Sequence, residues 1–257
     1  MTSAPVVLVT GAGRRLGRAI ALELAAHGWQ VAVHYRGSPG DAEDTARELG
    51  GGARTFHADL ADEGACQALV PAVVAACGRL DAVVNNASLF EVDDVHSFSY
   101  AAMDRHWRTN TAPAVVLARG LFDALAARGP EARGAVVNLL DQKLFNPNPD
   151  HLSYTLSKAA LQFATTVLAQ ALAPRVRVCA VAPGLTLGSD MIDSSRLAQL
   201  QAATPLQRGV AAADVSRSVR FLLENQSVTG STLLVDAGSH LAPAARDFAF
   251  QSPESTA

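Results

Sequence analysis

Tyr154 and Lys158 are the pair of side chains in this chain best suited to acid–base chemistry. They lie four residues apart in a segment with helical character, Leu152–Leu172, so they share one face of the predicted helix. A free phenol has a pKa of about 10. A nearby lysine cation favours the phenolate and lowers that pKa. We therefore expect Tyr154 to donate a proton at neutral pH, with Lys158 as the group that tunes it.

Lysine is scarce in the sequence, so the position of each one is informative. Besides Lys158 there is only Lys143, which follows Asp141 by two residues. We expect Lys143 to be a solvated loop charge. The alternative is that it pairs with Asp141 and keeps that carboxylate ionised.

A glycine-rich turn near the N-terminus could hold a pyrophosphate. A predicted strand, Val6–Thr10, runs into the turn Gly11-Ala12-Gly13-Arg14-Arg15-Leu16-Gly17, and a helical segment follows. Glycine lets the backbone approach a phosphate closely, and a helix N-terminus offers free N–H groups and a positive dipole end. Because the turn lies between a first strand and a helix, it predicts a dinucleotide site rather than only a tight turn.

The end of the second predicted strand indicates which dinucleotide. It has the sequence His34-Tyr35-Arg36-Gly37-Ser38, without the acidic residue that would accept a hydrogen bond from the ribose 2′-hydroxyl of NAD. Arg36, Ser38 and the pair Arg14–Arg15 suit a 2′-phosphate instead. We therefore expect NADPH as the cofactor; the alternative is that these arginines are only solvated surface charges.

Short apolar runs alternate with longer helical segments along the chain. The runs are β-branched or apolar nearly throughout, as expected for strands buried on both faces of a parallel sheet. Strand–helix alternation implies βαβ crossovers. The sequence predicts an α/β protein, a single-domain Rossmann-type doubly wound fold with a seven-stranded parallel sheet and helices on both faces. The predicted strands are Val6–Thr10, Gln30–His34, Arg54–Ala58, Ala82–Asn85, Ala135–Leu139, Arg177–Val181 and Thr232–Val235, and the predicted helices are Leu16–Ala26, Asp41–Leu49, Gly64–Cys77, Tyr100–Ala127, Leu152–Leu172 and Ala213–Glu224.

We expect one cofactor-binding domain over residues 1–241 and a tail over 242–257. Leu185–Leu206 interrupts the alternation directly after a strand, where ligand sites of such sheets lie, and is therefore a candidate lid. The tail mixes Phe248 and Phe250 with Pro, Ser and acidic residues. We expect it either to fray or to dock on a neighbouring subunit.

Composition excludes several classes of protein. The 257 residues are 49% hydrophobic and 18% charged, a mixture that forms a core. The net charge of −3 argues against a protein that coats nucleic acid. Cys66, Cys77 and Cys179 are too few and scattered for a disulfide framework or a metal site. We expect a cytoplasmic protein with no signal peptide, no membrane span, no metal and no nucleic-acid partner.

The motifs occur in the order typical of the short-chain dehydrogenase/reductase superfamily, which the chain resembles from Val6 to about Gly238. They are Thr10-Gly11…Gly17, Asp59-Leu60, Asn85-Asn86-Ala87, Asn110, Tyr154…Lys158 and Pro183-Gly184. The resemblance implies that Asp59 and Leu60 flank the adenine and that Asn86 and Ala87 lie along the cofactor. It further implies that Asn110 supports Lys158, that Lys158 also holds the nicotinamide ribose, and that the nicotinamide lies at Pro183, Gly184 and Thr186.

Two departures from the superfamily pattern are similar to its pteridine reductase branch, which includes dihydromonapterin reductases. Arg15 replaces a common glycine, and Asp141 replaces the usual serine thirteen residues before the tyrosine. An ionised aspartate can only accept hydrogen bonds, so we expect Asp141 either to accept from the N–H groups of a heterocycle or to relay a proton. The run Asn85-Asn86-Ala87-Ser88-Leu89-Phe90, together with His34-Tyr35, fits the branch as well.

The branch implies a site for a flat ring. Phe90 would stack on a pterin opposite the nicotinamide, a contact worth about 0.5–1.5 kcal/mol beyond burial. Ser88 and Arg15 would contact the cofactor phosphate or the pterin. Phe90 as an ordinary core aromatic and Asp141 as a cap at a strand end are the alternatives.

These residues predict an NADPH-dependent reductase that converts a dihydropterin, or a pterin or dihydrofolate, to the tetrahydro form. Tyr154, Lys158, Asn110 and Asp141 would carry the catalysis, with a small pterin-like molecule as substrate. The alternatives are a ketone or 3-oxoacyl reductase and a non-catalytic NADPH-binding regulator. The resemblance also implies a homotetramer or homodimer built on Tyr100–Ala127 and Leu152–Leu172.

Overall fold

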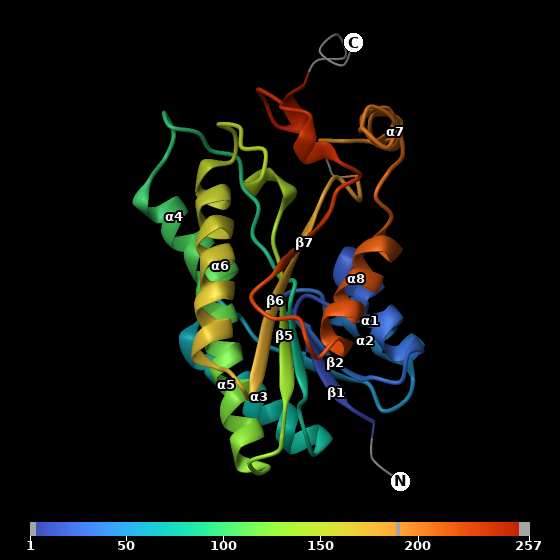
Figure 1. Cartoon of the computed structure of the whole chain (residues 1–257), viewed down its shortest axis with the longest axis vertical. Helices are drawn as coiled ribbons and strands as arrows, with labels where there is room; N and C mark the ends of the chain where they lie inside the picture. Colours follow the sequence, from blue (N-terminus) through green and yellow to red (C-terminus); the bar gives the residue numbers. More distant parts are fainter. Residues whose placement is uncertain (1–3, 189–190, 252–257) are drawn as a thin grey trace.

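The computed structural model describes residues 4–188 and 191–251, and its centre is a single parallel sheet. The strand order is β3-β2-β1-β4-β5-β6-β7, with every pair parallel. The order reverses direction between β1 and β4, the switch point at which ligands bind in doubly wound sheets. The strands, shown in Figure 1, are β1 (Val6–Val9), β2 (Gln30–Tyr35), β3 (Arg54–His57), β4 (Ala82–Asn85), β5 (Gly134–Leu139), β6 (Val176–Pro183) and β7 (Thr232–Val235).

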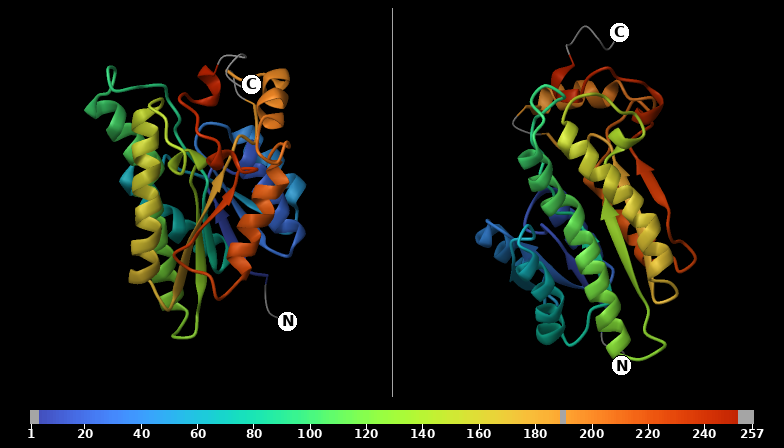
Figure 2. Two further views of the ribbon diagram at one scale, coloured as in Figure 1. Left: turned by 45° about the horizontal axis from the view of Figure 1, so that its top comes forward. Right: turned by 90° about the vertical axis from the view of Figure 1, so that its left-hand side faces the viewer.

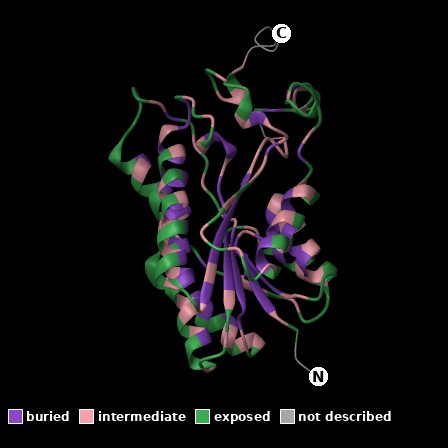
Figure 3. Cartoon of the chain, viewed as in Figure 1, coloured by how far each residue is buried: buried purple, intermediate pink, exposed green. Residues whose placement is uncertain are grey.

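Helices cover both faces of this sheet because the strands are apolar on both sides. In β1, Val7 and Val9 face one core, while Val6 and Leu8 face the other. The central strands are therefore buried along most of their length (Figure 3). One core is closed by α1 (Arg15–Ala26), α2 (Pro39–Leu49) and α8 (Ala212–Glu224), and the other by α3 (Glu63–Cys77), α5 (Ala112–Ala127) and α6 (Leu152–Ala171), as Figure 2 shows.

This architecture confirms the predicted fold class, and the strands lie within two residues of their predicted bounds. The prediction of one continuous helix over Tyr100–Ala127 is wrong. The segment is divided into α4 (Tyr100–His106), a π turn (Trp107–Thr111) and α5. Pro113 explains the break, because it has no N–H to continue the helical hydrogen-bond ladder. Single π turns of this kind are frequent at functional sites.

The segments after β6 and β7 lie above the carboxyl ends of the strands. The predicted lid contains α7 (Ser194–Ala202), and its residues 189–190 lie outside the described part of the chain. The tail forms two short 3₁₀ turns, Ser239–Leu241 and Phe248–Phe250. Residues 242–251 pack on their own chain, whereas the tail was expected either to fray or to dock on a neighbouring subunit. Residues 252–257 lie outside the described part of the chain. None of the helices described is long and apolar enough to cross a membrane.

Candidate active site

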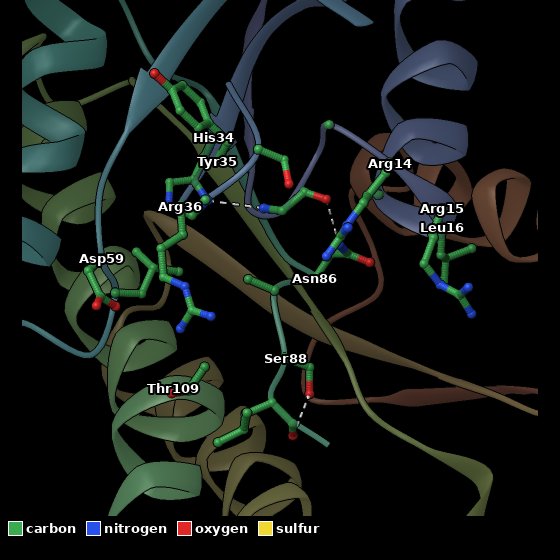
Figure 4. Close-up of a pocket in the computed structure, with 18 residues that line it drawn as sticks. Arg14, Arg15, Leu16, His34, Tyr35, Arg36, Asp59, Asn86, Ser88 and Thr109 are labelled. Carbon is green, nitrogen blue, oxygen red and sulfur yellow. Dashed lines mark hydrogen bonds between the residues drawn. The ribbon is translucent and has the colours of Figure 1, made fainter. Parts of the chain in front are cut away.

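A pocket of about 510 Å³ opens at the switch point, where the glycine-rich turn meets the ends of β2 and β4. Fourteen of the predicted cofactor residues line it (Figure 4): Gly11, Arg14, Arg15, Leu16, Gly17, His34, Tyr35, Arg36, Ser38, Asp59, Leu60, Asn86, Ala87 and Ser88. Four further residues line it that were not predicted from the sequence: Gly13, Gly37, Leu89 and Thr109. The first three lie inside segments already singled out, whereas Thr109 enters on the π turn, for which Pro113 is the local signal.

The turn can approach a phosphate closely because its glycines leave no room for side chains. A Cβ atom on Gly17 would lie 2.2 Å from the carbonyl oxygen of Gly11 and 2.6 Å from Nδ2 of Asn86. Gly11 itself has a φ of +63°, a conformation that glycine adopts at little cost. Its carbonyl and that of Thr10 accept hydrogen bonds from Asn86 Nδ2. The close packing of strand, turn and helix fits a pyrophosphate at the start of α1.

His34 braces this turn from behind. The Gly11 N–H donates to His34 Nδ1 at 3.0 Å, and Nε2 lies 3.1 Å from the carbonyl oxygen of Ala58, to which it can only donate. Burial lowers the pKa of His34 to about 4, so the ring is neutral at physiological pH. Both ring nitrogens are therefore used within the protein, and His34 contributes to the pocket by positioning Gly11.

The arginines around the pocket have different positions. Arg14 and Arg36 are exposed and reach toward the middle of the pocket, whereas Arg15 points away from them (Figure 4). The Arg15 guanidinium donates to the carbonyl oxygen of Gly188 at 2.6 Å, which ties the glycine turn to the lid segment. Arg15 has a φ of +53°, a left-handed conformation that costs about 1 kcal/mol in a residue other than glycine.

Tyr154 and Asp141 meet beside the end of β5. The Tyr154 hydroxyl donates to Asp141 Oδ2 at 2.8 Å. Burial raises the pKa of the carboxyl above its usual value, although the Lys143 backbone N–H, Tyr154 and Lys158 oppose the shift. Burial and the neighbouring carboxylate together raise the pKa of the phenol well above 10. The hydrogen bond between them gives a proton a direct path from one group to the other.

Lys158 is buried next to this pair. Its Nζ donates to the carbonyl oxygen of Leu139 at 2.7 Å and lies 5.8 Å from the centre of the Tyr154 ring. Burial lowers its pKa to about 8, against the attraction of Asp141. The expected lowering of the Tyr154 pKa by this lysine is not found, because burial and Asp141 act on the phenol more strongly.

Asn110, in the π turn, holds two neighbouring segments in place. Its Oδ1 accepts from the Leu89 N–H at 2.7 Å, and its Nδ2 donates to the Leu89 carbonyl at 2.9 Å and to Ser157 Oγ at 2.9 Å. Ser88 Oγ lies 3.3 Å from the same Oδ1. Asn110 thus fixes the loop that carries Ser88 and Phe90 against the helix that carries Tyr154 and Lys158.

Phe90 forms an exposed aromatic wall beside the phenol. Its ring is edge-on to Tyr154 at 4.6 Å and stacks on His151 at 4.1 Å. Nearly half of the Phe90 surface, 47%, is exposed, so this ring is not the ordinary core residue that was the alternative. A flat ligand could pack on it next to the Tyr154 hydroxyl.

Asp141 also caps the short 3₁₀ turn Gln142–Leu144 by accepting from the Lys143 N–H at 2.9 Å. The alternative role as a cap therefore coexists with the contact to Tyr154. Lys143 is buried, and its Nζ bonds to the Asp150 carbonyl and to Asp247, not to the carboxylate of Asp141. Both expectations for this lysine, a solvated charge and a side-chain pair with Asp141, are wrong.

The pocket at the switch point does not include the predicted residues of the nicotinamide end. Tyr154, Lys158, Pro183, Gly184 and Thr186 lie farther along the strand ends. A Cβ on Gly184 would lie 2.8 Å from Cα of Asp236, so the chain after β6 packs tightly on the chain after β7. Among the described residues there is no cluster of three His, Cys, Asp or Glu side chains that could hold a metal ion.

Comparisons with known proteins agree with this arrangement. Residues 11–240 match a family model described as enoyl-(acyl carrier protein) reductase. The solved structure of FolM alternative dihydrofolate reductase 1 from Brucella suis, in complex with NADP, is 40% identical, covers 99% of each chain and has a TM-score of 0.88. Pteridine reductase 1 of Leishmania tarentolae is 33% identical over 93% of this chain and 97% of its own. A putative ketoacyl reductase of the granaticin polyketide synthase of Streptomyces violaceoruber is 34% identical, over 93% and 97%.

The chain belongs to the short-chain dehydrogenase/reductase family of oxidoreductases. Within that family, the pteridine reductase and the FolM structures among its relatives support its place in the pteridine reductase-like branch.

Proposed function

We propose that this protein is an NADPH-dependent reductase that converts a dihydropterin, or a related pterin or dihydrofolate, to the tetrahydro form. The observation that carries the proposal is the hydrogen bond between Tyr154 and Asp141 beside the exposed ring of Phe90. A proton-sharing pair next to a flat aromatic wall suits a flat heterocycle that must be protonated on nitrogen.

The arginines support NADPH over NADH. Arg14, Arg36 and Ser38 line the pocket where the ribose 2′-phosphate would lie. No acidic residue stands between His34 and Ser38 to accept from a 2′-hydroxyl. The FolM structures in complex with NADP are in accord with this choice.

Each catalytic residue has a distinct role in this proposal. The bound cofactor supplies the hydride. Phe90 stacks on the pterin and holds it near Tyr154. Tyr154 donates a proton to the ring nitrogen next to the reduced carbon, and Asp141 replaces that proton. Lys158 holds the nicotinamide ribose and contributes positive charge beside the pair.

Asn110 fixes the loop that carries Phe90, and Pro183, Gly184 and Thr186 border the nicotinamide. Ser88 and Arg15 would contact a cofactor phosphate or the pterin. For Arg15 this requires the guanidinium to leave the Gly188 carbonyl, to which it is bonded in the structure.

Reduction of a ketone or a 3-oxoacyl ester is the second candidate, and the granaticin ketoacyl reductase is the observation that favours it. Such a substrate needs hydrogen-bond donors at its carbonyl oxygen. Asp141 stands in place of the serine that the superfamily uses as such a donor, which favours the pterin. A non-catalytic NADPH-binding regulator is a weaker proposal, because Tyr154, Lys158 and Asn110 are all present.

We further propose that the protein works in the cytoplasm as a homotetramer or homodimer. Exposed apolar side chains support a subunit contact through α5 and α6. Val115 is 40% exposed, Val167 44% and Phe163 73%. Phe163 and Val167 lie four residues apart on α6 and therefore share one face, and exposed apolar residues of this kind are typical of interaction surfaces.

Consumption of NADPH by the purified protein in the presence of a dihydropterin tests the proposal. We expect turnover with NADPH and weak or no turnover with NADH. Tight binding of NADPH without turnover of a dihydropterin, a dihydrofolate or a carbonyl compound would instead support the regulator.

A further inference from the structure

Four charged side chains join the C-terminal segment to the loop that follows β5. Lys143 Nζ, 3% exposed, donates to Asp247 Oδ2 at 3.1 Å and to the Asp150 carbonyl at 2.6 Å. Arg246 bonds to the Asp150 carboxylate through Nη2 at 2.8 Å and through Nε at 3.0 and 2.9 Å. The Asp247 N–H donates to the same carboxylate at 2.7 Å. Two residues of the loop and two of the tail are thus joined in one network.

A series of aromatic rings runs from the tail to the phenol. Phe250 lies 5.7 Å from His151 with the two rings nearly parallel, and His151 stacks on Phe90 at 4.1 Å. Phe90 in turn is edge-on to Tyr154. The Arg246 guanidinium lies 5.3 Å from the centre of the Phe250 ring. This contact connects the charged network to the series of rings. Phe250 thus packs behind the ring that stacks on the Phe90 wall.

The tail also contacts the lid. Arg196 of α7 donates through Nη2 to the Gln251 carbonyl at 2.8 Å, and Asn146 of the loop donates to the Ala242 carbonyl at 2.8 Å. The red C-terminal segment accordingly lies between the N-terminal end of α6 and α7 in Figure 1 and in the left-hand view of Figure 2. The C-terminal segment therefore links α7 to the loop between β5 and α6 above the strand ends.

The loop between β5 and α6 needs such support. Its only regular structure is the 3₁₀ turn Gln142–Leu144, and it ends at His151 in the left-handed conformation with a φ of +54°. A strained backbone of this kind persists only where surrounding contacts determine it. The carbonyl of Glu91, at 2.9 Å from His151 Nδ1, supplies one such contact, the ring of Phe90 supplies a second, and Phe250 of the tail supplies a third.

We propose that residues 242–251, which we call the C-terminal strap, position the wall Phe90 and the loop Asp141–His151 for reaction. Arg246, Asp247 and Phe250 are positioning residues that act through Asp150, Lys143 and His151. The proposal rests on the proposed function only in that Phe90 is the surface on which the substrate ring packs.

Three variants test the strap against one control. Arg246→Ala removes the contacts to Asp150 and Phe250, Phe250→Leu removes the ring but keeps an apolar side chain, and Arg246→Lys keeps the charge. Arg217→Ala is the control, because Arg217 forms an exposed ion pair with Asp214 on α8, in the core layer formed with α1.

We expect Arg246→Ala and Phe250→Leu to lower kcat/KM for a dihydropterin by about tenfold, since small displacements of reacting groups are costly. The Kd for NADPH should stay within about twofold, because the cofactor pocket lies away from the strap. Arg246→Lys should recover part of the loss. Hydrogen exchange of residues 142–151 should become faster in the first two variants and remain unchanged in Arg217→Ala.

Unchanged kcat/KM and unchanged exchange in Arg246→Ala would overturn the proposal. An equal loss in Arg246→Ala and Arg246→Lys would also contradict it, since the charge would not matter. If the wild-type protein turns over no dihydropterin, the proposed function fails, and the exchange of residues 142–151 still decides whether the strap holds the loop.

Discussion

The hydroxyl of Tyr154 donates a 2.8 Å hydrogen bond to Oδ2 of Asp141. The family tyrosine is thus paired with a carboxylate that burial has made less acidic. Two strongly coupled groups titrate as a pair, so a proton taken from the phenol can be replaced from the carboxyl. This relationship distinguishes the chain from a reductase in which a serine donates to a carbonyl oxygen.

Asp141→Asn should lower kcat for a dihydropterin by about a hundredfold, the usual scale of general acid catalysis. The amide fills the same space but has no exchangeable carboxyl proton. Because the pKa of Asp141 is raised, wild-type kcat should fall as the pH rises through the pKa of the pair, and this dependence should be weaker in the variant. A pH series of initial rates, with the Kd for NADPH measured alongside, checks both effects. An equal loss of NADPH binding would contradict the role of Asp141.

Arg36→Ala should weaken NADPH binding by about tenfold, the value of a charge-assisted hydrogen bond of roughly 1.5 kcal/mol, and leave NADH binding unchanged. Fluorescence titration with each cofactor measures the two affinities. Arg47→Ala serves as the control, since Arg47 is paired with Asp44 on the exposed side of α2. If both cofactors lost affinity equally, Arg36 would not recognise the 2′-phosphate.

Gly17→Ala should abolish high-affinity NADPH binding, because the added Cβ would lie 2.2 Å from the Gly11 carbonyl oxygen. Gly40→Ala is a matched control in α2 with no atom within 4 Å of the added Cβ. It should bind NADPH normally and gain up to about 1 kcal/mol in free energy of unfolding from helix propensity. Calorimetric titration and denaturant unfolding of both variants separate binding from stability. Normal binding by Gly17→Ala would mean that the turn can rearrange.

Asp81→Asn should lower the free energy of unfolding by about 2–3 kcal/mol. Asp81 accepts from Arg79, Arg128 and the Val6 N–H at the N-terminal edge of the sheet. Burial alone would raise the pKa of Asp81, but these three donors outweigh it and lower the pKa. Its contribution is therefore full above the unfolded pKa of about 4 and is lost as the pH falls through the folded value.

Urea unfolding at neutral and acidic pH measures this contribution. The difference between wild type and Asp81→Asn should shrink toward low pH. Asp44→Asn, at an exposed pair, should change the free energy by less than about 0.5 kcal/mol. A difference between wild type and Asp81→Asn that is independent of pH would contradict the assignment.

The sequence was sufficient to predict features that depend on local pattern. Apolar runs predict strands that are buried on both faces, and the glycine turn predicts much of the lining of the cofactor pocket. Each of these features depends on residues that are close together in the sequence. The pairing of Tyr154 with Asp141 could be anticipated, because Asp141 replaces the superfamily serine that acts together with the tyrosine.

Long-range contacts were not predictable from that pattern. The bond from Lys143 to Asp247 joins residues 104 positions apart, so neither neighbourhood indicates it. The raised pKa of Tyr154 depends on its burial, which spacing along a helix does not reveal. The π turn at Trp107–Thr111 has a local signal in Pro113, but its contact from Thr111 to the Ser157 carbonyl is not visible in the sequence.

The most direct test of the account is the rate of NADPH oxidation with a dihydropterin and with a small 3-oxoacyl ester, measured side by side on the wild-type protein. We expect fast turnover of the dihydropterin and little or none of the ester, because Phe90 offers a flat wall for a heterocycle and Asp141 replaces the serine that donates to a ketone oxygen. Fast turnover of the ester alone would contradict it and would make the protein a carbonyl reductase.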